Sequence, residues 1–143
     1  MQGLPPEQHT RRLAALRLVR NFQCDIGVGS NADWQSSASP VVRVSNERGT
    51  SFAALTITNI GNPRDSATMT GNNHSIKVAV FETENGLHFL ERTADGVNLT
   101  TVFADTADGL GAREYAAVSS DHYTLPAVAI TPSQFHGKCK SVD

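Results

Sequence analysis

The chain contains little cysteine, no long hydrophobic run and no large excess of charge. Only two of its 143 residues are cysteines, which excludes a small scaffold held together by several disulfides. No apolar stretch approaches the roughly 18 residues that cross a bilayer as a helix, so the sequence predicts no transmembrane segment. An apolar fraction of 39% and a charged fraction of 18% are typical of one globular domain.

The small net charge of −2 argues against a nucleic-acid partner. Residues 1–20 contain four arginines and one acidic residue, whereas the remaining 123 residues hold 8 basic and 13 acidic side chains. An acidic body repels phosphate backbones, and no stripe of lysine and arginine is interleaved with aromatic residues. We therefore expect no nucleic-acid partner, and the sequence leaves open whether the partner is a protein or a small ligand.

The two cysteines, Cys24 and Cys139, lie near the two ends of a predicted single β domain over residues 22–143. The ends of a domain are often close together, so we predict a disulfide with Cα atoms no more than about 7 Å apart. Two buried free thiols are the alternative. A zinc site is disfavoured because neither cysteine has partners at ligand spacing.

The N-terminal leader, residues 1–21, is predicted to be helical over Glu7–Arg20 or loosely ordered, after Pro5 and Pro6. A disulfide favours a secreted or periplasmic protein. However, Arg17 interrupts the apolar residues 13–16, so the leader does not match a signal peptide. Whether a native leader is cleaved stays open, and the cytoplasm is the alternative compartment.

From Phe22 onward, short stretches rich in Val, Ile, Thr and Phe alternate with Gly, Asn, Asp, Pro and Ser, which is typical of a mainly β protein. We predict an antiparallel sandwich or a small flattened barrel of seven to eight short strands. The predicted strands are Phe22–Val28, Val41–Asn46, Phe52–Asn59, Ile76–Thr83, Leu87–Arg92, Val97–Ala104 and Tyr115–His122, with a last one near Ala127–Thr131 or Gln134–Cys139.

The clearest local pattern is a three-stranded meander from Ile76 to Ala104. Asn85-Gly86 and Asp95-Gly96 separate strand-like runs, and both pairs tolerate the positive φ of tight hairpin turns. The segment Asn59–His74 is polar and rich in Gly, Asn and Thr, so we predict a long loop there.

No sequence motif identifies a reaction. The chain lacks a Gly-x-Ser-x-Gly elbow, and Asp121 and His122 are adjacent in a predicted strand, so they point to opposite faces. The best candidates for an enzyme or a metal-binding protein are His88, His122 and Glu114, if the fold gathers them on one sheet face. We expect no cofactor and no metal.

The sequence is compatible with three hypotheses about function. The favoured one is a non-enzymatic, exported binding or interaction module closed by one disulfide. The alternatives are a small enzyme or metal-binding protein that uses histidines and carboxylates, and a structural or assembly subunit that pairs through its sheet edges. A hollow barrel would favour a small ligand.

Overall fold

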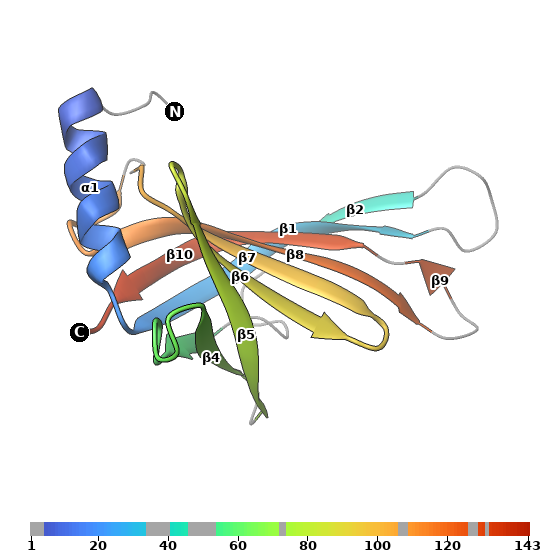
Figure 1. Ribbon diagram of the computed structural model, residues 1–143. Helices are drawn as coiled ribbons and strands as arrows, with labels where there is room; N and C mark the ends of the chain where they lie inside the picture. Colours follow the sequence, from blue (N-terminus) through green and yellow to red (C-terminus); the bar gives the residue numbers. More distant parts are fainter. Residues whose placement is uncertain are drawn as a thin grey trace.

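The computed structural model of the chain describes residues 5–33, 41–45, 54–71, 74–105, 109–125, 129–130 and 132–143. One helix precedes the strands, and the order of the elements along the chain is shown in Figure 1. The helix is α1 (Pro6–Leu18), and the strands are β1 (Phe22–Asp33), β2 (Val41–Ser45), β3 (Leu55–Thr58), β4 (Ser66–Gly71), β5 (His74–Thr83), β6 (Gly86–Thr93), β7 (Gly96–Phe103), β8 (Glu114–Leu125), β9 (Ala129–Ile130) and β10 (Ser133–Ser141).

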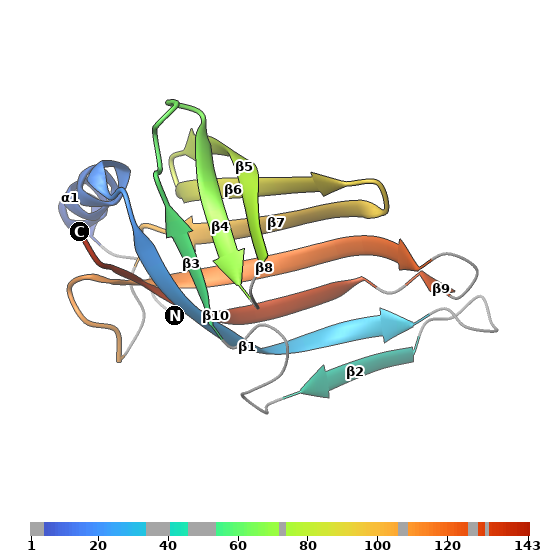
Figure 2. The same cartoon turned by 90° about the horizontal axis from the view of Figure 1, so that it is seen from below.

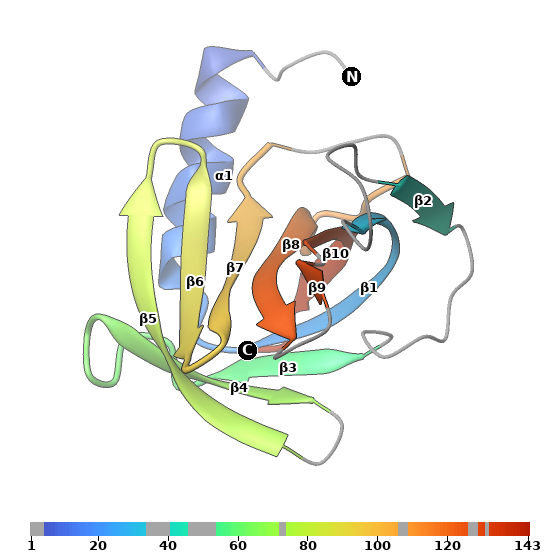
Figure 3. The same ribbon diagram turned by 90° about the vertical axis from the view of Figure 1, so that its right-hand side faces the viewer.

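Eight of the strands form a closed antiparallel barrel. Each strand in the order β1-β3-β4-β5-β6-β7-β8-β10 pairs with the next, and β10 pairs with β1 to close the ring. Viewed from the end opposite α1, the strands surround a common interior (Figure 3). The mainly β prediction is confirmed, and of its two forms the barrel is the one observed.

Two short strands extend the barrel wall at the end away from α1. β1 pairs with β3 only over residues 22–24, and its outer part pairs with β2 instead (Figure 2). β9 pairs with the end of β8. The predicted strands at 41–46, 52–59 and 127–131 correspond in part to β2, β3 and β9, and their residues 46, 52–53, 127–128 and 131 lie outside the described residues.

The meander over residues 76–104 is confirmed as β5, β6 and β7, joined by turns at residues 84–85 and 94–95. Gly86 is required at the start of β6, because a Cβ atom there would lie 2.0 Å from the backbone oxygen of Val102. The turn residues therefore determine the hairpin of β5 and β6, and the close approach at Gly86 determines how β6 packs against β7.

The prediction of a loop over Asn59–His74 is wrong in its second half, where β4 lies. β4 turns Ala67 and Met69 inward and carries Ser and Thr at most other positions. Its apolar face consists of these two side chains, one of them small, so alternation was too weak to indicate a strand. The observed connection between β3 and β4 is a turn of seven residues, 59–65.

The core fills the half of the barrel next to α1. The largest side chains in it that are fully buried include Phe22, Ile26, Ile57, Phe89 and Val102. Cys24 and Cys139 lie directly opposite each other in β1 and β10 and form a disulfide with a Cα–Cα distance of 4.0 Å. The predicted disulfide is thus confirmed, and it joins the first and last strands of the barrel.

Helix α1 covers this end of the barrel (Figure 1). Its range, Pro6–Leu18, overlaps most of the predicted helix over Glu7–Arg20. Leu16 is fully buried in the barrel core, and Val19, just after the helix, is almost fully buried. Arg12 lies over the ring of Tyr115 at 4.7 Å and donates hydrogen bonds to the carbonyls of Ala104 and Glu114. The leader is therefore packed into the β domain. In the described part of the chain, no helix has the length and apolar character to cross a membrane.

Candidate functional site

Polar side chains replace the hydrophobic core in the half of the barrel away from α1. The strand register places five polar residues opposite one another on neighbouring strands β6, β7, β8, β10 and β1. We call this set the polar row: Glu91, Asn98, Asp121, Ser133 and Asn31.

Strand alternation turns the polar row toward the interior. Glu91 has the same parity as the buried Leu87 and Phe89, and Asp121 the same parity as the buried Tyr115 and Ala117. In the middle of the row, Asn98 is only 4% exposed. The interior of this half of the barrel is therefore lined by groups that prefer water.

Strand β7 places its alternating apolar side chains on the outer face of the barrel. The sequence places Val97, Leu99 and Phe103 on one face, and that face is the outer, half-buried one. The inner face carries Asn98 and Thr100. Burying polar groups costs free energy unless they are hydrogen-bonded, and such departures from core patterning concentrate at functional sites.

A closed hydrogen-bond network joins Asn98, Thr100, Ser119 and Asp121. The Asn98 amide donates to the Ser119 hydroxyl at 2.9 Å and to the carboxylate of Asp121. The Thr100 hydroxyl donates to the Asn98 side-chain oxygen at 3.1 Å and lies 3.1 Å from the Ser119 hydroxyl. Ser133 donates to the second Asp121 oxygen at 3.1 Å.

This network uses every polar hydrogen that its members offer. Both amide hydrogens of Asn98 are engaged, and each hydroxyl has one hydrogen, which is also engaged. A carboxylate has about four lone-pair positions, and Asp121 receives two hydrogen bonds. The network therefore has acceptor capacity left and no donors.

The second carboxylate of the row, Glu91, has no hydrogen bond or ion pair among the described residues. Burial raises the pKa of Glu91, and the neighbouring Asp121 raises this pKa further, whereas His74 lowers it. Asp121 is only 5% exposed and also lacks a cationic partner in the described part of the chain. Two carboxylates thus share a site that no described Lys, Arg or His neutralises by an ion pair.

Solvent reaches the polar row at its two ends. β5 pairs with β6 only as far as Leu90, so the edge of β6 at Glu91 has no partner in β5. β6, β7, β8, β10 and β1 continue beyond β4 and β5 (Figure 1). Glu91 and Ser133 are partly exposed and Asn31 is exposed although all three face inward. Glu91 and Asn31, the two ends of the row, are therefore in contact with solvent.

His88 is on the outer face of β6, away from the row, as its position between Leu87 and Phe89 predicts. Its ring stacks on Phe81 with centroids 4.9 Å apart and lies within hydrogen-bond distance of the Thr83 and Thr101 hydroxyls, at 2.7 and 2.9 Å. Burial lowers the pKa of His88.

His122 and Glu114 lie far from His88 and from each other. His122 is exposed on the outer face of β8, which β7 separates from β6. Glu114 is at the opposite end of β8, eight residues and roughly 27 Å away. A 2.8 Å ion pair with Lys138, and then the Gly111 amide, lower the pKa of Glu114. The structure does not bring these three candidates together.

No group of three or more His, Cys, Asp or Glu side chains in the described residues is arranged to hold a metal ion. The polar row was missed because it contains none of the residue spacings that identify catalytic motifs. The sequence contains one indication of the row. In β8, Tyr115, Ala117, Ser119 and Asp121 occupy alternate positions and therefore lie on the same face of the strand.

Comparison of the chain with protein-family models, with curated proteins and with solved structures found no match.

Proposed function

We propose that the protein is a non-enzymatic, exported binding protein that takes a small organic cation at the polar row. The observation that carries this proposal is the imbalance of hydrogen-bonding groups: the row has two carboxylates and spare acceptors, and the side-chain donors of Asn98, Thr100, Ser119 and Ser133 are already used. A ligand that supplies donors and positive charge completes both deficits.

An ammonium group matches this row better than a metal ion does. It presents three hydrogen-bond donors and no acceptor. Calcium takes six to eight oxygen ligands, whereas the described residues hold no group of three or more His, Cys, Asp or Glu side chains that could bind a metal ion. Burial and, after it, the charge of Asp121 raise the pKa of Glu91, and a bound cation would offset the repulsion between the two carboxylates.

The disulfide supports the exported part of the proposal. Disulfides persist in oxidising compartments, so we place the protein outside the cytoplasm, as a secreted or periplasmic protein. Its two sulfur atoms belong to almost fully buried residues, Cys24 and Cys139. They are therefore part of the core and do not belong to the polar row, where we place the ligand.

The test is calorimetric titration with n-butylammonium at neutral pH, beside 1-butanol and Ca²⁺. We expect the ammonium to bind and the neutral alcohol and the metal ion not to bind. Glu91→Gln keeps the shape of the side chain and removes its charge, and should weaken butylammonium binding about tenfold or more, because hydrogen bonds to charged groups contribute about 1.5–3 kcal/mol.

Asp95→Asn is the matched control, because Asp95 is an exposed carboxylate in the nearby β6–β7 turn. This variant should bind butylammonium like the unmodified protein. Equal binding of butanol and butylammonium, or an equal loss in Glu91→Gln and Asp95→Asn, would contradict the proposal.

A further inference from the structure

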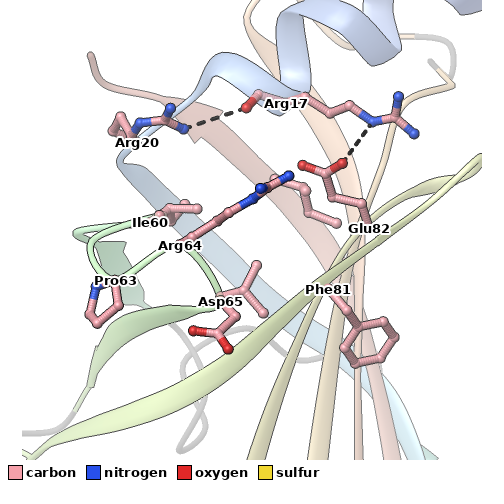
Figure 4. A pocket seen from close by; sticks show the side chains of 11 residues that line it. Arg17, Arg20, Ile60, Pro63, Arg64, Asp65, Phe81 and Glu82 are labelled. Carbon is pink, nitrogen blue, oxygen red and sulfur yellow. Dashed lines mark hydrogen bonds and ion pairs between the residues drawn. The ribbon is translucent and has the colours of Figure 1, made fainter.

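A second candidate site lies at the other end of the barrel, next to α1. A pocket of about 630 Å³ opens between the end of α1, the turn from β3 to β4, and β5. Three arginines from two of these segments line it: Arg17, Arg20 and Arg64 (Figure 4). The polar row does not contribute to this pocket, so binding at the pocket does not depend on the proposed function.

The three guanidinium groups differ in how many hydrogen bonds and ion pairs they already form with the protein. Arg17 is 3.3 Å from a carboxylate oxygen of Glu82 and donates to the Thr83 carbonyl, also at 3.3 Å. Among the described residues, the Arg20 guanidinium makes only long contacts of 3.5 Å to the carbonyls of Arg17 and Val19. These two arginines therefore keep donors available.

Arg64 is the most available cation of the pocket. It forms no hydrogen bond or ion pair with any residue that the structure describes, and its side chain extends toward the Arg17–Glu82 pair (Figure 4). A free guanidinium presents a planar fork of donors that matches a carboxylate with two parallel hydrogen bonds. The pocket thus has an unfilled position for an anion.

Part of the remaining lining is apolar. Ile60 and Leu87 are almost fully buried, at 4% and 2% exposure, and Val80 is half-buried beside them. Ligand pockets commonly combine such an apolar lining with a few polar groups that orient the ligand. A bound anion would therefore rest its apolar body mainly on Val80, which is the most exposed of these three side chains.

The charge balance of the lining favours a ligand with a single negative charge. Three arginines and two carboxylates, Asp65 and Glu82, line the pocket, which leaves one unit of positive charge in excess. The C-terminal end of α1 adds partial negative charge at its carbonyls. A dianion would meet these groups unfavourably.

We propose that this pocket is a binding site for small amphipathic carboxylates. The carboxylate pairs with Arg64, with Arg20 close by, and the apolar chain lies on Ile60, Val80 and Leu87. Because Glu82 already forms an ion pair with Arg17, the incoming carboxylate competes with Glu82 for that guanidinium.

The experiment is calorimetric titration of the full chain with octanoate, 1-octanol, acetate and inorganic phosphate. Octanoate should bind at least tenfold more tightly than each of the other three. Octanol binding as tightly as octanoate would show that charge is irrelevant. Equally tight binding of acetate or phosphate would show that the apolar lining is irrelevant, and either result overturns the proposal.

Variants locate the binding. Arg64→Ala should weaken octanoate binding tenfold or more, and Glu82→Gln should strengthen it because Arg17 is released. Arg92→Ala removes an exposed arginine from the far end of β6 and should leave the affinity unchanged. An unchanged affinity in Arg64→Ala, or an equal loss in Arg92→Ala, overturns the assignment. Thermal unfolding of each variant verifies that it is folded.

Discussion

Removing the Cys24–Cys139 disulfide should lower the stability of the protein strongly. The bridge closes a loop with a sequence separation of 115. In the chain-entropy description such a loop removes about 16 cal/mol/K from the unfolded ensemble, or about 5 kcal/mol at 25 °C. Domains are stable by only about 5–15 kcal/mol, so the double variant Cys24→Ala/Cys139→Ala should lose a large part of its free energy of unfolding. The midpoint of thermal unfolding should fall by about 15 °C.

Urea unfolding followed by circular dichroism measures this loss. The same titration with a reducing agent separates the covalent link from the side-chain packing, because reduction removes the link and keeps both sulfur atoms. Reduced protein and the double variant should therefore lose similar amounts, the variant slightly more through its lost volume. Intact mass with and without thiol alkylation verifies the oxidised state. A loss below about 1 kcal/mol in both cases would refute the reasoning from loop entropy.

Three further predictions concern helix α1 and two titratable groups, Glu91 and His9. Leu16→Ala should cost about 2–5 kcal/mol in urea unfolding, because Leu16 is fully buried between α1 and the barrel; a loss below about 1 kcal/mol would contradict this packing. Glu91→Gln should raise stability at neutral pH: the raised pKa of Glu91 means that stability falls as pH rises from about 4.5 through that pKa, so the gain should vanish in acid. The pKa of His9 is raised mainly by Asp105, 2.5 Å away, and also by the Glu84 carbonyl. The stability that His9 contributes should be complete below pH 6.5 and decline as pH rises through the raised pKa, and urea midpoints of the protein and of His9→Ala should converge in alkali.

Residue alternation and turn chemistry were sufficient to predict the β class and the meander. β5 and β6 carry clear apolar alternation, and Asn85 and Asp95 mark their turns. Cysteines near the two ends of a domain suggested the closing pair. β4 could not be predicted in the same way, because its buried face consists of Ala67 and Met69 among hydroxyl side chains.

The candidate site was less accessible to prediction, for a different physical reason. Sequence patterns identify the buried face of a strand by its apolar residues, and β7 places Asn98 and Thr100 inside with Leu99 outside. Only the barrel register brings Glu91 and Asp121 to the two sides of Asn98. His88 and His122 were conspicuous by residue type, but strand order and length separate them. Tertiary pairing, which a single sequence does not contain, therefore determined the site.

The position of β10 between β8 and β1 has a consequence for biosynthesis. Of the strands described, β10 leaves the ribosome last, yet it pairs along both of its edges. Until residues 133–141 are available, β1 and β8 each expose an edge whose backbone groups can pair with another chain, and the thiol of Cys24 has no partner. Contacts between distant parts of a chain form slowly, so the incomplete barrel is the form most prone to aggregate. A chaperone that acts during synthesis would protect this protein chiefly by shielding these two strand edges.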